Sequence, residues 1–249
     1  MIIDNPRAEH LTALRLLWQQ AFGDPDGFLD DFFAKGFAFD RCRCVFREGE
    51  PVAAVYRFDG VWQDKKIAYL YALAVAEGHR GQGLSRLLLA DTHGALRRMG
   101  YAGAVLEPAT DALREYYSRL GYRAFGARQE QRIRASAEPE ALSELGLLGY
   151  EQARKKYLPQ NGICQPGALT EFLQTQARLL GGEDFVAAVS RQDAFILEFL
   201  GNENRIPGLL RALDMEEAVV RLPGGAATSM YLSLDESSDL PSYFGLPMD

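Results

Sequence analysis

The chain has 249 residues, 47% of them hydrophobic and 24% charged, and a formal net charge of −7 at pH 7. These proportions exclude a disordered or fibrous protein. The acidic balance makes duplex nucleic acid a poor partner, because binding to a phosphate backbone requires a basic face. No window reaches the roughly 18 uninterrupted apolar residues of a membrane helix, and the N-terminus lacks the features of a signal peptide. We therefore expect a cytoplasmic protein with no membrane partner.

The cysteines and histidines are too few for a metal centre. Three cysteines in a chain of this length do not indicate a disulfide framework. Cys42 and Cys44 would share one face of an expected strand, but no second pair of cysteines or histidines lies nearby to complete four ligands. We expect both to be small buried residues, and we expect no metal.

The N-terminal region predicts two helices followed by a hairpin. Apolar residues recur at helical spacing from Leu11 to Ala21, and the pattern stops at Gly23, a typical C-cap. A second amphipathic stretch covers residues 27–35. Residues 42–47 and 51–58 have the composition of two strands joined by a short turn.

Residues 67–76 form an apolar run in which bulky and small side chains alternate. The bulky set is Ile67, Tyr69, Tyr71, Leu73 and Val75, and the small set is Ala68, Ala72 and Ala74. Regular alternation would place the two sets on opposite faces of a strand. The small-residue face would then allow close approach, either by a packed helix or by a ligand.

A helix from Leu84 to Gly100 and a buried strand over 101–106 come next. Because crossover connections are right-handed, this strand should lie parallel to the 67–76 strand. A helix over 111–120 and a strand over 122–134 complete an α/β domain.

The second half echoes this order of elements. The expected elements after a linker at 136–139 are helices over 150–157 and 168–180, strands over 185–189 and 194–200, a helix over 206–213, and strands over 218–222 and 229–234. We therefore expect an α/β (α+β) fold of two tandem lobes, 1–135 and 136–249, each a mixed, partly parallel sheet flanked by helices. The segment Gly201–Arg205 carries acidic and amide side chains where the first half has a glycine loop. We expect one cofactor per chain, bound by the first lobe.

That glycine loop joins the 67–76 strand to the next helix. Its residues are Arg80, Gly81, Gln82, Gly83, Leu84 and Ser85. A strand–loop–helix junction directs backbone N–H groups and the positive end of a helix dipole toward an anion. The glycines let the backbone come close, Arg80 adds a cation and Ser85 adds a hydroxyl. The loop therefore predicts a phosphate site.

Two kinds of nucleotide loop do not fit these residues. A nucleotide P-loop requires Gly-Lys-Ser/Thr, but Leu84 follows Gly83. A dinucleotide fingerprint requires a third glycine at the position of Arg86. A nucleotide-binding regulatory module therefore ranks below the two hypotheses developed next.

The loop and its neighbours resemble the GNAT superfamily of acyl-CoA N-acyltransferases. The signature Arg/Gln-x-x-Gly-x-Gly/Ala is matched by Arg80-x-x-Gly83-x-Ser85, in which Ser85 is a departure. Leu73-Ala74-Val75 and the segment Tyr116–Tyr122 also look like the family, so the likeness spans most of residues 1–135. The resemblance implies acetyl-CoA as a co-substrate. It places Arg80–Ser85 at the pyrophosphate and pairs the backbone of Leu73, Ala74 and Val75 with the pantetheine.

The resemblance also implies a general acid. Tyr117 stands four residues before Gly121, where the superfamily commonly has a tyrosine that protonates the departing thiolate of CoA. A phenol is protonated at neutral pH and can donate this proton. Tyr117 also falls on the apolar face of its helix, which leaves a core role open, and Tyr116 is the second candidate.

The attacking amine must lose a proton, which requires a base or desolvation. Glu107, at the end of the central strand, is our candidate base. A chain of water molecules is an alternative to Glu107, and Glu107-Pro108 could equally shape the turn.

Within the superfamily, the arrangement is similar to tandem-lobe acetyltransferases of the enhanced-intracellular-survival type. Local likenesses are Trp18–Asp24 and Tyr69–Ala72. We expect the chain to lack the sterol-carrier-like domain of those enzymes, and their substrates are not carried over. Those enzymes place a chain-terminal carboxylate in the active site, which adds Asp249 to the catalytic candidates.

These observations predict direct transfer of an acetyl group from acetyl-CoA to a primary amine of a small molecule or peptide. Transfer within a ternary complex needs no covalent enzyme intermediate. The alternative is a non-catalytic acyl-CoA-binding sensor or scaffold. A homo-oligomer is compatible with the sequence.

Overall fold

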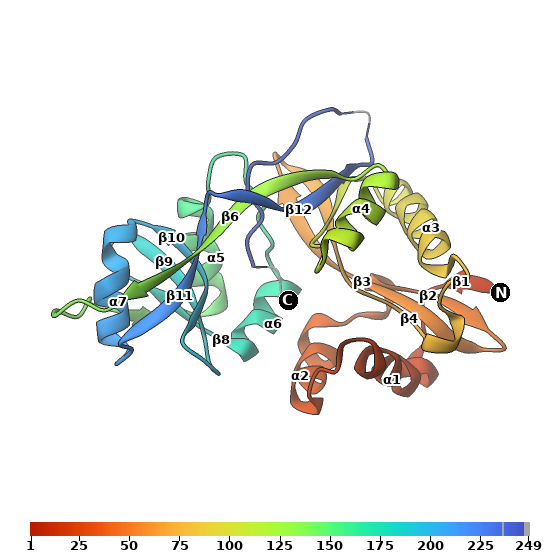
Figure 1. The fold of residues 1–249 in the computed structure, drawn as a ribbon, viewed down its shortest axis with the longest axis horizontal. Coiled ribbons are helices and arrows are strands. Elements are labelled where there is room, and N and C mark those ends of the chain that lie inside the picture. Colours follow the sequence, from red (N-terminus) through yellow and green to blue (C-terminus); the bar gives the residue numbers. More distant parts are fainter. Residues whose placement is uncertain (236, 247–249) are drawn as a thin grey trace. The chain divides into compact units, whose positions relative to one another are not determined.

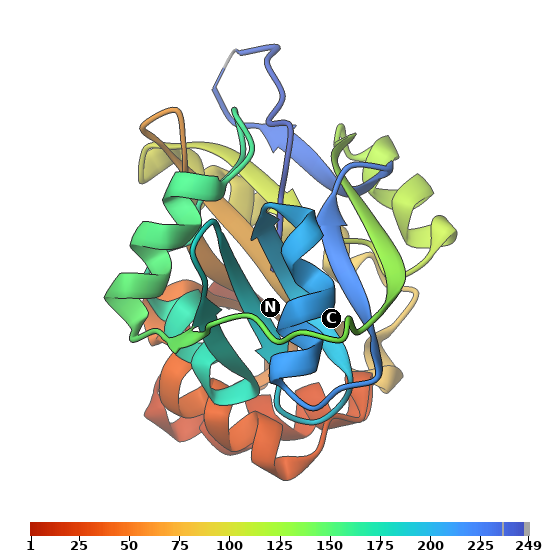
Figure 2. The same ribbon diagram turned by 90° about the vertical axis from the view of Figure 1, so that its left-hand side faces the viewer.

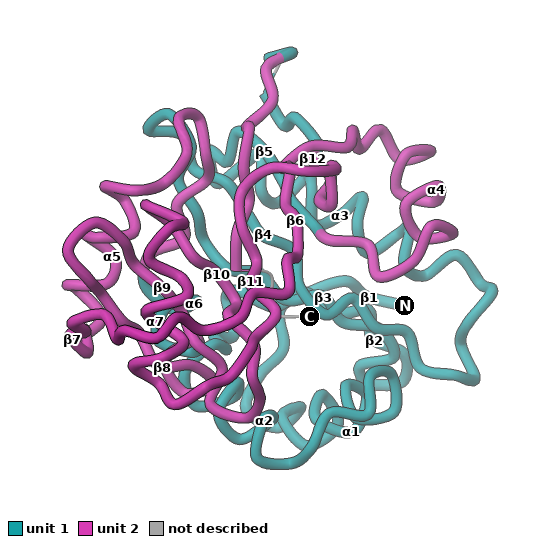
Figure 3. Tube along the Cα trace, turned by 60° about the vertical axis from the view of Figure 1, so that its left-hand side comes forward, with its two compact units in different colours: residues 1–106, 167–172, 232–238 teal, residues 107–166, 173–231, 239–249 magenta. Residues whose placement is uncertain are grey.

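The computed structural model describes residues 1–235 and 237–246, which fall into two compact units. Unit 1 contains residues 1–106, 167–172 and 232–238, and unit 2 contains residues 107–166, 173–231 and 239–249 (Figure 3). The predicted lobes, 1–135 and 136–249, stay a prediction, and the compact units place residues 107–135 in unit 2. None of the described helices is long and apolar enough to cross a membrane.

Unit 1 is built on a sheet with the strand order β1-β2-β3-β4-β5. Its elements are β1 (Ile2–Asp4), α1 (Leu11–Phe22), α2 (Asp26–Asp31), β2 (Cys42–Arg47), β3 (Glu50–Trp62), β4 (Lys65–Val75), α3 (Leu84–Arg98) and β5 (Tyr101–Leu106) (Figure 1). Neighbouring strands are antiparallel except β4 and β5, which are parallel as predicted. The second predicted helix ends early, at Asp31, and a π-helical turn over Phe32–Gly36 follows it.

Helices α1 and α3 cover opposite faces of this sheet. Trp18 of α1 is buried, and its ring centroid lies 5.0 Å from that of Tyr56 in β3. The next residue of β3, Arg57, points to the other face because side chains alternate along a strand. There it lines a hollow together with Thr92 and Leu96 of α3. Cover on both faces explains why β3 is buried at every position from Val52 to Phe58.

A bulge interrupts β4 at Ala72. The φ angle of Ala72 is +49°, in the left-handed region that residues with a Cβ rarely adopt. Tyr71 lies opposite Tyr56 of β3, whereas Ala74, three residues further on, lies opposite Ala54, only two residues away. One extra residue has therefore been inserted into β4, which bends the strand and reverses its alternation.

The bulge changes which groups the end of β4 presents. Regular alternation predicted Leu73 and Val75 on the face of Tyr71, but the register puts Ala74 there, so this prediction is wrong beyond the bulge. Pairing of β4 with β5 ends at Tyr69, whereas pairing with β3 continues to Val75. Among the described residues, no β5 residue lies opposite positions 72–75 of β4.

Unit 2 has the strand order β12-β6-β11-β10-β9-β8-β7. Its elements are α4 (Asp111–Arg119), β6 (Arg123–Arg134), β7 (Ser143–Glu144), α5 (Leu147–Tyr157), α6 (Ala168–Gln176), β8 (Ala177–Gly181), β9 (Phe185–Ser190), β10 (Phe195–Gly201), α7 (Ile206–Ala212), β11 (Glu217–Pro223) and β12 (Ala226–Ser233), of which α6 and β12 straddle both units. Helix α7, in front in Figure 2, buries Leu209 and Leu210 against Phe199 and Val220.

The helix predicted over 168–180 is wrong beyond Gln176. Residues 177–181 instead form β8, which pairs with β9 in antiparallel register. A short, continuously apolar run does not distinguish a buried helix from a buried strand, and this one is decided by its neighbour in the sheet.

The two halves of the chain repeat one order of elements. The series β1-α1-α2-β2-β3-β4-α3-β5 corresponds to β7-α5-α6-β8-β9-β10-α7-β11. In each series only the last two strands are parallel to one another, β4 with β5 and β10 with β11. The structure extends the predicted repeat by β1, β7 and β8.

A buried ion pair lies in the core of unit 2. Arg154 of α5 donates from Nε to Glu198 Oε2 at 2.6 Å and from a terminal nitrogen to Oε1 at 2.9 Å. Tyr243 donates its hydroxyl to Oε1 at 2.9 Å, and the hydroxyl of Tyr150 lies 3.4 Å from Oε2. A charge as buried as Glu198 is tolerated only when it is paired and hydrogen-bonded. Tyr243 also ties residues 239–246 to this core.

The two tyrosines offer a matched test of this cluster. Loss of a hydrogen bond to a charged group costs about 1.5–3 kcal/mol. We expect Tyr243→Phe to lower the free energy of unfolding by this amount, and Tyr150→Phe to lower it less because its contact with the carboxylate is longer. Urea unfolding at pH 7 measures both. Equal losses would contradict the stronger role of Tyr243.

Acid should destabilise unit 1 through His93 of α3. Burial, followed by the charge of Arg97, lowers the pKa of His93 to about 4. The unfolded chain, with a pKa near 6.5, binds the proton first, so stability falls as the pH drops from 6.5 toward 4. The full effect is about 3 kcal/mol. We expect the difference in unfolding free energy between pH 7 and pH 4 to shrink by this amount in His93→Gln. If the unfolding free energies of His93→Gln at pH 7 and pH 4 differ as much as those of the unaltered chain, the role of His93 is refuted.

Candidate functional site

The predicted phosphate loop leaves the end of β4 and enters α3. Gly81 and Gly83 both have φ angles of +74°, a left-handed conformation that glycine adopts without strain. A Cβ atom built on either residue meets no heavy atom within 4 Å, so open space surrounds the loop. The N–H of Leu87 donates to Gly83 O at 3.1 Å, which makes this loop the start of α3. The N–H groups of the first turn therefore point out of the helix end at the loop.

Arg80 ties this loop to β4. Its Nε donates to Val75 O at 3.2 Å, and the side chain is otherwise exposed. The bond uses one of the five N–H donors of the guanidinium, and the other four can contact an anion. The structure thus brings together the two predicted parts of the cofactor site, Leu73–Val75 and Arg80–Ser85.

Two backbone surfaces meet in this part of unit 1. Within residues 1–235 and 237–246, no strand pairs with the β5-facing edge of Ala72–Val75, and a strand edge binds extended chains that carry amide groups. The N-terminus of α3 at Gly83–Ser85 offers N–H groups and a positive dipole end, which bind phosphate. A ligand that carries both amides and phosphates would satisfy both surfaces. Leu84 is buried and anchors the helix, whereas Gln82 is exposed on the loop.

Tyr117, the predicted general acid, lies on α4 in unit 2. It is buried, with its ring centroid 5.2 Å from that of Tyr116 and 5.7 Å from that of Tyr122. Burial, followed by the neighbouring Tyr116, raises the pKa of Tyr117 to about 12. The phenol is therefore protonated throughout the neutral range, as a proton donor must be.

Glu107, the predicted base, is held by two donors in unit 2. Arg128 donates to Glu107 Oε1 at 2.5 Å and to Oε2 at 3.5 Å, and the hydroxyl of Ser229 donates to Oε2 at 2.9 Å. The side chains of Glu107 and Arg128 are each 8% exposed. A proton accepted by this carboxylate would leave the buried Arg128 without its counter-charge, which is costly. This geometry favours a fixed charge.

Arg128 and Ser229 were not predicted from the sequence. Ser229 is 122 residues from Glu107, and the two meet because β12 pairs with β6 in a register that places Ser229 opposite Phe125. Arg128 is one of several arginines in β6, and no spacing singles it out. Both partners of Glu107 are set by strand pairing between distant segments.

The remaining predictions concern Asp249 and the cysteines. Asp249 lies outside the described residues. Cys42 and Cys44 are buried on one face of β2, as expected, with their Sγ atoms 3.6 Å apart, and burial raises the pKa of the Cys42 thiol. Among residues 1–235 and 237–246, no three His, Cys, Asp or Glu side chains gather as metal ligands.

The helix of unit 2 that corresponds to α3 begins differently. Before α7, the side-chain oxygen of Asn202 accepts from the N–H of Asn204 at 3.2 Å. Arg205 forms ion pairs with Glu183 and Asp184, both at 3.0 Å. The side chains of unit 2 thus occupy a position where unit 1 has an open glycine loop.

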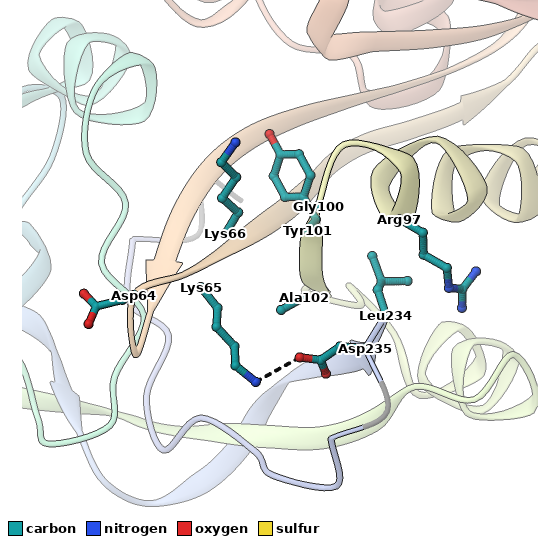
Figure 4. A pocket seen from close by; sticks show the side chains of 9 residues that line it. All are labelled: Asp64, Lys65, Lys66, Arg97, Gly100, Tyr101, Ala102, Leu234 and Asp235. Carbon is teal, nitrogen blue, oxygen red and sulfur yellow. Dashed lines mark hydrogen bonds and ion pairs between the residues drawn. The ribbon is translucent and has the colours of Figure 1, made fainter.

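A hollow of about 520 Å³ lies beside the start of β5 in unit 1 (Figure 4). Lys65 donates to Asp235 Oδ2 at 2.9 Å within its lining, and this bond holds the pKa of Asp235 below its usual value. Lys66 and Arg97 also line the hollow but lie apart from this pair (Figure 4). The cations do not converge on one point, and the hollow contains none of the predicted site residues.

Comparisons with known proteins find a family model that is similar to the first part of the chain. A family model described as acetyltransferase (GNAT) family matches residues 10–122. A search of curated proteins finds no match. The fold is similar to a GCN5-related N-acetyltransferase from Kribbella flavida, with a TM-score of 0.72 and 18% identity over 94% of this chain and 71% of that one.

Two further solved structures share this fold. A GCN5-related N-acetyltransferase from Anabaena variabilis has a TM-score of 0.71 and 15% identity, covering 94% of this chain and 73% of its own. Eis1 from Mycobacterium abscessus has a TM-score of 0.68 and 13% identity, covering 94% of this chain and 74% of its own. At these identities the likeness concerns the fold.

The left-handed glycines give a test of the loop itself. We expect Gly83→Ala to lose about 1–2 kcal/mol of stability, because a Cβ atom is strained at this φ angle even where space is open. Gly78→Ala is the control, since Gly78 has equally open space without a positive φ angle. Urea unfolding compares the two variants. Similar stability of both would show that loop conformation does not constrain position 83.

Proposed function

We propose that the chain, whose residues 10–122 match the acetyltransferase (GNAT) family, is an acyl-CoA N-acyltransferase that acetylates a primary amine using acetyl-CoA. The acceptor is a small molecule or a peptide. The observation that carries the proposal is the junction in unit 1, where the strand edge of Ala72–Val75 leads into the anion loop Arg80–Ser85.

The chemistry of CoA matches this junction. We propose that the pyrophosphate binds the N–H groups at the start of α3 and the guanidinium of Arg80, since both favour anions. The pantetheine arm carries two amides, and backbone groups of Leu73, Ala74 and Val75 are placed to pair with them as a neighbouring strand would. The half-buried side chains of Leu73 and Val75 then border the arm.

Bound acetyl-CoA supplies the activated acetyl group. The neutral amine forms the new C–N bond with the thioester carbon while the C–S bond breaks, and the thiolate takes a proton. We propose that the Tyr117 hydroxyl donates this proton, because its raised pKa keeps it protonated at neutral pH. Tyr116 is the second candidate for the donor.

The proton released by the amine needs an acceptor. Both oxygens of Glu107 are engaged by Arg128 and Ser229, so the arrangement favours removal of this proton through water. Glu107 then acts as a fixed negative charge that is retained through the reaction. Positioning of the two reactants in one complex accounts for much of the expected rate.

The setting of the reaction is proposed on the same basis. We place it in the cytoplasm, with one CoA site per chain, because α7 in unit 2 begins with ion-paired side chains where α3 begins with glycines. Neither nucleic acid nor a membrane is part of the proposal. A homo-oligomer is compatible with it.

Tyr117→Phe tests the general acid. We expect kcat to fall by roughly 10²–10⁴, because the variant lacks the donated proton, whereas the affinity for CoA should not change. Tyr116→Phe is the matched control, one residue away with the same loss of a hydroxyl, and should keep kcat. If Tyr116→Phe lowers kcat and Tyr117→Phe does not, the general acid is Tyr116.

Binding of CoA is tested separately from turnover. At 100 times its Kd, CoA should stabilise the chain by about 2.7 kcal/mol in thermal unfolding. Turnover is then measured with acetyl-CoA and a panel of amines and peptides. Stabilisation without turnover by any acceptor would indicate a CoA-binding sensor or scaffold. Stabilisation by ATP or NAD in place of CoA would favour a nucleotide-binding module and overturn the proposal.

A further inference from the structure

A second hollow in unit 1, of about 460 Å³, lies between the sheet and the C-terminal half of α3. Its lining residues are Asn5, Phe39, Asp40, Arg43, Arg57, Thr92, Ala95, Leu96, Arg98 and Met99. This volume is within the range of about 300–1,000 Å³ that is usual for small-molecule sites. Met99 follows Ser85 by fourteen residues, so the far end of the hollow is about 20 Å along α3 from the glycine loop. The hollow is therefore distinct from the proposed CoA site.

The wall of the hollow is largely apolar. Leu96 and Ala95 contribute the face of α3, and Phe39 and Met99 add two large apolar side chains to its lining. Phe39 is 38% exposed and Met99 is 42% exposed. An apolar body bound in the hollow would remove both from water.

Arg57 supplies a buried cation to this wall. The residue is 9% exposed, its Nε lies 3.4 Å from Asp59 Oδ1, and one terminal nitrogen donates to Asp40 O at 2.6 Å. These two contacts and a hydrogen bond to the Tyr101 side chain use three of the five N–H donors of the guanidinium, which leaves two. Because Arg57 lines the hollow, the remaining donors are available to a ligand bound there. The guanidinium also lies 5.5 Å from the ring centroid of Tyr101, which holds it in place.

The charges around the hollow favour a single negative charge. Arg43, Arg57 and Arg98 line it against one carboxylate, Asp40, in a chain whose net charge is −7. Arg43 is paired with Asp91 and Arg57 with Asp59, whereas none of the described carboxylates pairs with Arg98. Arg98 therefore supplies the unpaired charge, and Arg57 supplies N–H donors beside it. Asp40 would repel a dianion such as a phosphate monoester more strongly than a monoanion.

We propose that this hollow binds a small monocarboxylate with a ring or branched alkyl body. Its carboxylate accepts from the remaining N–H donors of Arg57 and from Arg98 at the rim, and its apolar body lies against Leu96, Phe39 and Met99. The binding of this ligand does not depend on acetyl transfer.

The test is isothermal titration of the full chain with sodium benzoate at pH 7. Benzamide, which has the same ring without the charge, and phenyl phosphate, which carries more charge, are titrated in parallel. We expect benzoate to bind in the millimolar range or tighter, and both analogues to bind at least tenfold more weakly. Equal binding of benzamide, or no binding of benzoate, would overturn the proposal.

Variants locate the site. Arg98 is exposed, so Arg98→Gln should leave the fold intact and weaken benzoate roughly fivefold, as expected for a partly solvated ion pair. Arg57→Lys should weaken it further, because an ammonium does not reproduce the guanidinium fork. Arg97→Gln is the matched control, since Arg97 is exposed on the same turn but lines the other hollow (Figure 4). Equal weakening by Arg97→Gln and Arg98→Gln would show non-specific attraction and refute the assignment.

Discussion

The inserted residue at Ala72 is the constraint on which the site in unit 1 depends. A bulge bends its strand, and the part of β4 beyond Ala72 continues with β3 while no β5 residue lies opposite it. The same insertion turns Ala74 inward and leaves Leu73 and Val75 half-buried beside the open edge. Arg80 then bonds to Val75, so the glycine loop begins where the open edge ends. The proposed amide-binding and phosphate-binding surfaces are adjacent for this reason.

Unit 2 repeats the order of elements but fills the equivalent region with its own side chains. The parallel pairing of β10 with β11 joins Phe195 and Ile196 to β11, and the register of β10 with β9 shifts before Glu198. Unit 2 thus repeats two features of unit 1, a short parallel pairing and a strand with an irregular register. Here Glu198 is buried with Arg154 and Tyr243. A left-handed glycine loop is replaced by ion-paired side chains before α7. Ion pairs therefore lie where unit 1 has its proposed ligand surface.

Buried charged residues that form closed ion pairs differ from a buried charged residue that lines a hollow. Glu107 with Arg128, and Glu198 with Arg154, are closed pairs in which both carboxylate oxygens accept hydrogen bonds. Such pairs are costly to break, which argues against proton transfer at either carboxylate. Arg57 is also largely buried, but it lines a hollow and keeps N–H donors that a ligand can use. Arg154 likewise leaves one terminal nitrogen without a partner, but that atom is sealed from solvent. The difference lies in access from a hollow.

The sequence by itself determined most helices and strands, the parallel β4–β5 pair and the anion loop, because periodicity, capping residues and glycines act locally. It also indicated a resemblance to the acetyltransferase (GNAT) family, through Arg80, Gly83 and the segment around Tyr117. Only the tertiary structure decided which face of the sheet Ala74 occupies, that residues 177–181 form the strand β8 and not a helix, and which residues contact Glu107. A bulge leaves no mark in an alternating run, and a short apolar segment suits helix or strand equally. Ser229 and Glu107 meet across 122 residues, and such a contact depends on strand register, which no local pattern encodes.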